Sequence, residues 1–204
     1  MSTLTNALTT KEKVKSYLGI SVATDDTMID MLIDQSTSFI ESYCGGRKFL
    51  SQSYTDIVDT KGGNKLFFYQ FPVSTLTSVE YRSGTPSTPI WSIFNVDTYL
   101  LYDKAGYVGF FGNLPKLMQA IRLKYTAGYL IDFSNEGTAT HTLPVDLTMA
   151  CTILVAHYYT NRQASGMSMV KTEGQEVRFK DTSDALPSAV KQILGNYQTF
   201  RYAI

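Results

Sequence analysis

The sequence predicts an α+β fold, in which a bundle of about four helices, an N-terminal pair and two C-terminal helices, carries an antiparallel β-rich insertion. Apolar residues recur at helical period near both ends of the chain. Between residues 54 and 129 the period falls to two, and turns containing Gly or Pro multiply. We therefore expect residues 1–47 and 140–204 to form a helical core and residues 48–139 to form the insertion.

Two helices are expected in the N-terminal part. Thr9 and Glu12 have capping-box spacing, and the short helix that they begin should end near Gly19. A long helix should start with the acidic residues at Asp25 and end at the glycines 45 and 46. Its apolar face consists of Ile29, Leu32, Ile33, Ile40 and Tyr43. A stripe this wide predicts burial within the subunit or between subunits, so the face is a candidate subunit-packing surface.

The middle of the chain should form a small antiparallel sandwich or barrel. Ile121, Leu123 and Tyr125 alternate with Arg122 and Lys124, which indicates a strand with one dry and one wet face. Strands are expected at Tyr54–Asp59, Leu66–Tyr69, Leu76–Arg82, Thr98–Asp103, Tyr107–Phe110 and Ala120–Tyr125. The many aromatic side chains here could form a carbohydrate platform or a stacking surface for single strands, but their alternation with polar residues favours core filling.

Helical period returns after a polar loop. Pro144 and Asp146 suit the first turn of a third helix and Arg162 suits its last turn. The polar segment that follows resembles a weak hairpin about Gly174, and a last helix is expected around residues 190–197.

The final residues are unusually aromatic for a terminus. We take Tyr197, Phe200, Arg201, Tyr202 and Ile204 as a candidate docking segment that a partner orders. The alternative is that this segment folds back onto the chain's own core.

The composition restricts the classes of partner. The 204 residues include 18 basic and 18 acidic side chains, so no net field attracts nucleic acid or anionic lipid. No apolar run is long enough for a membrane span, and we expect a soluble intracellular product. Cys44 and Cys151 lie in helical apolar patterns and should be free thiols.

Catalytic, cofactor-binding and metal-binding residues are not predicted, and we expect no enzyme. The two histidines, His141 and His157, have neither the spacing of a catalytic triad nor that of a zinc site. The glycine pairs lack the spacing of a phosphate-binding loop. Acidic pairs such as Asp56 and Asp59 are better explained as solvated charge, although a hydrolase with an unrecognised site stays open.

Several phrases, taken in order, resemble one family. They are LTTKEKVKSYLGIS with the long helix after it, FPVSTLTSVEYRSG, IRLKYTAGYL with LPVDLTMACTILVAHYYTNR, and EGQEVRFKDTSDALPSAVKQILGNYQTF. Together they resemble the tailed-bacteriophage head-to-tail connector family of adaptor and head completion proteins. The resemblance covers most of the chain apart from about residues 91–112. The smallest members of that family are nearly all helical, so the resemblance places the helices better than the β insertion.

The resemblance implies a structural protein of the virion neck, without a catalytic step or cofactor. Such a subunit would join a ring, commonly twelve-fold, beneath the portal protein. The ring would extend the channel through which genomic DNA passes without sequence-specific binding, and would receive the tail or a stopper or nozzle protein. The aromatic tail would be the portal-facing element. A tail-completion or stopper subunit, and a glycan- or surface-binding β module, are the alternatives.

Overall fold

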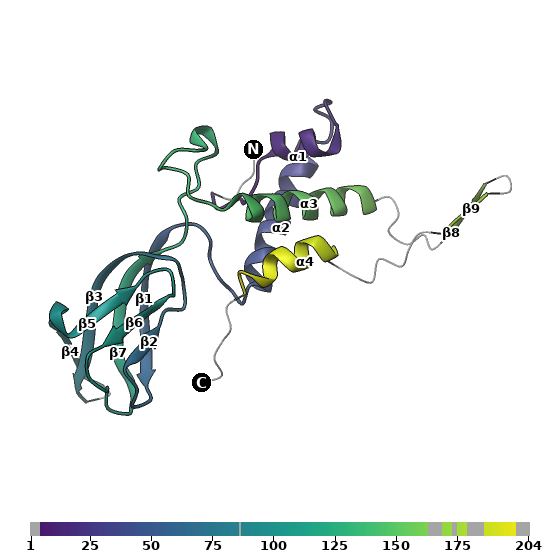
Figure 1. The fold of residues 1–204 in the computed structure, drawn as a ribbon. Coiled ribbons are helices and arrows are strands. Elements are labelled where there is room, and N and C mark those ends of the chain that lie inside the picture. Colours follow the sequence, from purple (N-terminus) through teal and green to yellow (C-terminus); the bar gives the residue numbers. More distant parts are fainter. Residues whose placement is uncertain (1–4, 86, 163–168, 173–174, 179–185, 199–204) are drawn as a thin grey trace. The chain divides into compact units, whose positions relative to one another are not determined.

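The chain folds into two compact units, which Figure 1 shows as a group of helices and a group of strands. The computed structural model describes residues 5–85, 87–162, 169–172, 175–178 and 186–198. The helical unit takes in residues 1–46, 133–136 and 142–204, and the β unit takes in residues 47–132 and 137–141. The predicted α+β class, with a β-rich insertion between helices, is confirmed.

The helical unit contains the four α-helices of the described residues. They are α1 (Lys11–Leu18), α2 (Asp26–Tyr43), α3 (Val145–Asn161) and α4 (Ser188–Gly195). Helix α3 packs against each of the other three, and so it lies at the centre of the unit. Its large inward side chains, Leu147 and Leu154, are fully buried together with Ile33 and Ile40 of α2 and Leu194 of α4. Burial of such side chains from water is the main force that holds the helices together.

The start of α1 differs from the predicted capping box. Thr10 is the N-cap, and its side chain accepts a hydrogen bond from the amide three residues on, at 3.4 Å. Thr9 is instead buried, and its hydroxyl lies 2.8 Å from that of Thr152 on α3. The expected cap is wrong because the core offers the Thr9 hydroxyl a partner that a local sequence pattern cannot show. The predicted end at Gly19 is confirmed, because that residue has the left-handed φ of 68°.

The β unit contains two antiparallel sheets. The first has the strand order β1 (Gln52–Thr60), β7 (Leu117–Ala127), β3 (Val73–Gly84) and β4 (Pro89–Ile93), and the second has the order β2 (Lys65–Phe67), β6 (Tyr107–Phe110) and β5 (Tyr99–Tyr102). All six expected strands exist, but β4 was not predicted. Its segment begins at a proline, which a strand tolerates at its first residue on a sheet edge.

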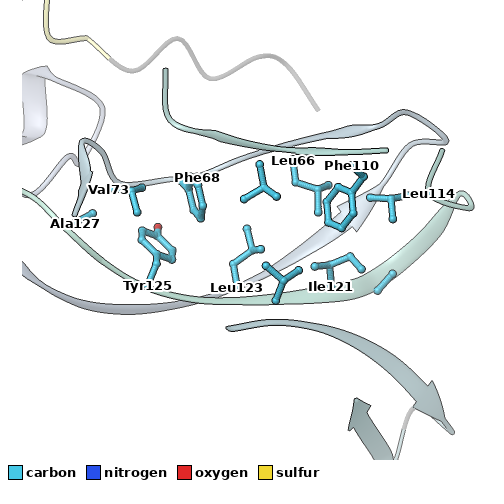
Figure 2. Close-up of a cluster of buried hydrophobic side chains, with 12 residues drawn as sticks. Leu66, Phe68, Val73, Phe110, Leu114, Ile121, Leu123, Tyr125 and Ala127 are labelled. Atoms are coloured by element: carbon cyan, nitrogen blue, oxygen red, sulfur yellow. The ribbon is translucent and has the colours of Figure 1, made fainter. Parts of the chain in front are cut away.

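The core of the β unit lies between the two sheets, and Figure 2 shows its buried side chains. Leu123 and Tyr125 of β7 are almost completely buried, and the Tyr125 ring lies 4.5 Å from the Phe68 ring, centroid to centroid. Arg122 and Lys124, which alternate with them and are partly exposed to solvent, point to the other side of the sheet. The expected wet and dry faces of this strand are therefore confirmed.

The two ends of the β unit are joined by a clasp between Phe49–Ser51 and Gly128–Tyr129. The Tyr129 amide donates to the Phe49 carbonyl at 2.6 Å, and the Ser51 amide donates to the Tyr129 carbonyl at 2.8 Å. Gly128 has a φ of +109°, and a Cβ added to it would lie 2.7 Å from the Leu50 carbonyl oxygen. Only glycine fits this conformation and this close approach of two backbones.

A separate antiparallel hairpin pairs β8 (Met169–Thr172) with β9 (Gln175–Arg178), where the sequence predicts a hairpin about Gly174. Among the described helices, none is both long and apolar enough to cross a membrane. Cys44 and Cys151 are buried free thiols, as expected.

Replacing Gly128 by Ala should loosen the clasp. The added Cβ meets backbone atoms and the new residue must hold a strained φ, so we expect a loss of about 2 kcal/mol or more in the free energy of unfolding. Thermal and denaturant unfolding measure it. Gly63→Ala is the matched control, since no atom lies within 4 Å of its added Cβ. Equal free energies of unfolding for the two variants would show that the close backbone approach at Gly128 does not contribute to stability.

Candidate interaction surfaces

The histidines of the chain have local structural partners. The Asp132 amide donates to His141 Nδ1 at 3.0 Å, and the His157 ring lies 3.1 Å from the Asn161 side-chain nitrogen. Burial raises the pKa of the Cys151 thiol to about 12, which keeps it protonated. Within the described ranges, no group of three or more His, Cys, Asp or Glu side chains could hold a metal ion.

The predicted subunit-packing face of α2 divides into two parts. Ile29, Ile33 and Ile40 are completely buried, and they belong to the core of the helical unit itself. For these three the alternative of burial within the subunit holds. Leu32 and Tyr43 are only half-buried, and packing between subunits stays a prediction for them.

Leu32 and Tyr43 belong to a second row on α2. With Met28, Gln35 and Phe39 they recur at helical spacing, which places all five on one side of the helix, and we call them the α2 row. Met28 and Gln35 are exposed, and the Phe39 and Tyr43 rings stack with centroids 6.1 Å apart. The α2 row is apolar except for Gln35 and is still open to solvent.

A comparable row follows the outer side of α3. Val145, Met149 and Ile153 are spaced four residues apart, and we call them the α3 row. Val145 is 79% exposed and Met149 is 44% exposed, although both are apolar. The inward side chains of α3, such as Leu147, lie about half a turn away from this row.

Only the first residue of the candidate docking tail is described. Tyr197 follows α4, and its hydroxyl donates to the Asp146 carboxylate, whose oxygens lie 2.7 and 2.8 Å away. This contact fixes the point at which the chain leaves α4, beside the first turn of α3. Phe200, Arg201, Tyr202 and Ile204 lie outside the described residues.

The β unit carries an apolar surface at the end away from the clasp, which we call the distal rim: Phe111, Leu117 and Met118. Their exposed fractions are 73%, 52% and 82%. A shallow cavity of about 230 Å³ lies beside the rim, lined by Tyr81, Phe94, Leu114 and Leu117 among others. Isolated exposed apolar residues are ordinary, but a group beside an apolar hollow is typical of a contact surface.

A bulge holds the distal rim in place. The β1–β7 register shifts between Val58 and Thr60, and Gln119 has a φ of 47°, which a residue with a side chain rarely adopts. The Gln119 amide donates to Asp59 at 2.6 Å, and the Leu117 amide donates to the Thr60 hydroxyl at 3.0 Å. Sequence reasoning missed this surface because a bulge turns side chains away from the face that strict alternation assigns them.

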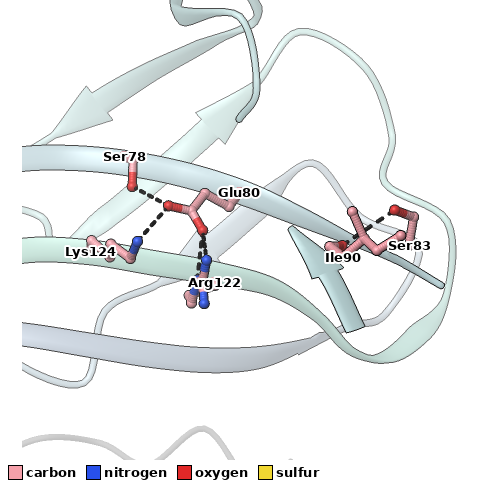
Figure 3. Close-up of polar contacts among 6 residues, drawn as sticks. All are labelled: Ser78, Glu80, Ser83, Ile90, Arg122 and Lys124. Atoms are coloured by element: carbon pink, nitrogen blue, oxygen red, sulfur yellow. Dashed lines mark hydrogen bonds and ion pairs between the residues drawn. The ribbon is translucent and has the colours of Figure 1, made fainter. Parts of the chain in front are cut away.

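The outer face of the four-stranded sheet carries a buried carboxylate, shown in Figure 3. Glu80 is only 4% exposed, and it accepts hydrogen bonds from Ser78 and Lys124 at 2.8 Å and from Arg122. The Arg122 guanidinium in turn lies 4.4 Å from the centre of the Trp91 ring. Burial alone would raise the pKa of Glu80, but the hydrogen bonds outweigh burial and lower it to about 2.

Comparisons with known proteins give one family match and several solved structures with a similar fold. A family model described as "Head completion protein" matches residues 7–200. No curated protein matches the chain. A chain in the neck of an empty gene transfer agent (GTA) particle, computed with C6 symmetry, has a TM-score of 0.59 and 16% identity, and the match covers 98% of this chain and 94% of that chain.

Two further solved structures have a similar fold. In the virion of a native GTA particle, a chain matches with a TM-score of 0.56 and 18% identity, covering 93% of this chain and 88% of that one. A chain in the neck of the native particle, computed with C12 symmetry, matches with a TM-score of 0.54 and 15% identity. The match covers 98% of this chain and 94% of that chain. The fold, including its β insertion, is therefore shared across most of both chains.

Replacing Glu80 by Gln should destabilise the β unit and change how its stability depends on pH. Arg122 and Lys124 lose a charged acceptor, so we expect a loss of about 1–3 kcal/mol at pH 7. Because folding lowers the pKa of Glu80 from 4.5 to about 2, the stabilisation is complete above pH 4.5 and is lost as the pH falls towards 2. The difference between wild type and variant should shrink over that window in denaturant unfolding.

The matched control for this experiment is Asp103→Asn, at an exposed turn in the same unit. Its stability should follow that of the wild type at every pH. A Glu80→Gln variant that also follows the wild type between pH 7 and pH 2 would contradict the pairing.

Proposed function

Because this chain belongs to the head completion protein family, we propose that it is an adaptor subunit of the virion neck, which forms a ring beneath the portal, extends the DNA channel and receives the tail. The observation that carries this proposal is the match of the family model over nearly the whole chain. The shared fold with proteins of a GTA neck supports the location.

A ring is supported by the symmetry of the similar structures, which were computed with C6 and C12 symmetry. Twelve copies of this chain would satisfy both. A net charge of zero suits a channel wall, because a strongly basic wall would hold the phosphates of passing DNA. A structural role of this kind needs no cofactor and no catalytic group.

The two ends of such a ring need different contact surfaces. We assign the C-terminal segment, from Tyr197 through Ile204, to the portal. Its base is fixed on α3 by the Tyr197–Asp146 contact, and the aromatic side chains that follow would gain stability by being buried against a partner. The distal rim of the β unit we assign to the tail-side component.

Removing residues 200–204 should abolish ring formation on the portal, because the apolar side chains that would dock are lost. Negative-stain imaging and mass photometry of the chain with its cognate portal measure this. A full-length variant with Phe200, Tyr202 and Ile204 replaced by Ser is the companion, and it should fail in the same way. Rings that form normally on the portal with both variants would overturn the tail assignment. A wild-type chain that never joins the portal would overturn the adaptor function and favour a tail-completion subunit.

Replacing Met118 by Glu should block tail attachment and leave the ring intact. A charge at this 82% exposed position costs the folded monomer little but would be buried without a partner in a docked complex. Electron microscopy of particles assembled with the variant should show necks without tails. Thr77→Glu, at an exposed position on β3, should give normal tails. Normal tails with Met118→Glu would refute the assignment of the distal rim.

A further inference from the structure

We propose that neighbouring subunits of the ring meet helix against helix, with the α2 row of one copy packed on the α3 row of the next. This inference rests on the proposed function, since it concerns the contact that closes the ring. The occupant of each row is therefore a second copy of this chain.

Both rows face away from the core of the helical unit. On α2, helix α1 lies over the opposite side, where Lys11 pairs with Asp26 at 3.2 Å and with Asp30 at 3.5 Å. On α3, Thr152 contacts Thr9, which precedes α1, and Asp146 contacts Tyr197, which follows α4. Val145 and Met149 lie between these two sides and are exposed. Among the described residues, each row thus combines exposed and half-buried side chains on the outer side of an otherwise packed helix.

The chemistry of the rows suits burial. No side chain in either row is charged, so packing them together would leave no buried ion without a partner. The α2 row extends over about 22 Å and the α3 row over about 12 Å, from the rise of 1.5 Å per residue. Thr160 continues the line of the α3 row with an exposed, small side chain, over which a second helix can approach closely. Met28 and Met149 can adapt their shape to a partner.

The two rows differ from each other, and this difference points to a ring. Packing α2 against α2 of a second copy would be a two-fold contact, which stops at a dimer and leaves both α3 rows in water. Packing the α2 row on the α3 row is a head-to-tail contact. It repeats from copy to copy, and once the rotation closes it covers both rows in every subunit.

Thiol cross-linking between two variants, each with one added cysteine, tests this contact. One partner carries Gln35→Cys in the α2 row, and the other carries Val145→Cys, Met149→Cys or Ile153→Cys, which samples the register along the α3 row. The native Cys44 and Cys151 are completely buried and will not react in the folded chain. The full-length proteins are mixed in the presence of the cognate portal, on which the ring is proposed to form, and are treated with a short bismaleimide.

We expect at least one mixture to give heterodimers in a yield about tenfold above that of either variant alone, because a docked pair holds the thiols at a high effective concentration. The matched control replaces Gln35→Cys by Ser16→Cys, an exposed position on α1 outside both rows. A chain with both Gln35→Cys and the reactive α3 substitution should form a ladder of oligomers. Yields that equal those of the single variants and the control in every mixture would overturn the contact, as would dimers of Gln35→Cys alone.

A second variant separates this inference from the proposed function. Met149→Glu should prevent ring formation on the portal, whereas Ser16→Glu should not, and circular dichroism checks that both chains fold. Rings that form normally with Met149→Glu would mean that the subunits meet elsewhere, and the adaptor function would stand. A wild-type chain that forms no ring on the portal would instead overturn the function.

Discussion

The fold depends on one constraint, which is that α2 and α3 must meet although the β unit separates them in the sequence. The chain leaves α2 at Tyr43 and enters α3 at Val145, and an unstructured loop of roughly 100 residues would oppose their contact entropically. The clasp brings Phe49 and Tyr129 together and shortens the effective loop to roughly 20 residues, which reduces that cost by about 1.4 kcal/mol.

The clasp has its own support. Arg47 is 2% exposed, and its guanidinium lies 3.8 Å from the centre of the Phe71 ring and donates to the Phe71 carbonyl. A buried cation in this position is satisfied by the ring and the carbonyl together. The Gly128 amide also donates to the Pro72 carbonyl at 3.0 Å, which ties the clasp to the start of β3. The ends of the β unit are therefore held by its own residues, and each unit can keep a separate core.

The sequence predicts the elements of this fold well where the signals are local. The boundaries of α2 follow from acidic residues at one end and two glycines at the other, and the strand Tyr107–Phe110 was predicted to the residue. The prediction failed where a contact with a residue far away in the sequence determines the local structure. The Thr9 hydroxyl bonds Thr152, 143 positions away in sequence, instead of capping α1. Likewise, helical period alone assigned Ile33 and Leu32 to one face, because it cannot tell which side of α2 the third helix covers.

The candidate surfaces were harder to predict than the elements, and the distal rim shows the physical reason. Leu117 and Met118 begin β7, and strict alternation would put one of them in the core. The bulge at Gln119 exposes both. A backbone held in a sparsely populated conformation is strained, so the Thr60 and Asp59 hydrogen bonds must hold it.

Exposed apolar surface also carries a risk for this chain. A net charge of zero gives no long-range repulsion between copies, so exposed apolar patches would favour non-specific aggregation. Here they are divided among separate places, with the rim on the β unit and two short rows on different helices. In the proposed assembly each of these three surfaces is covered by a different contact. This division would help a subunit of the proposed assembly to stay monomeric before its partners arrive, since only the closed ring, docked at both ends, would bury all three surfaces.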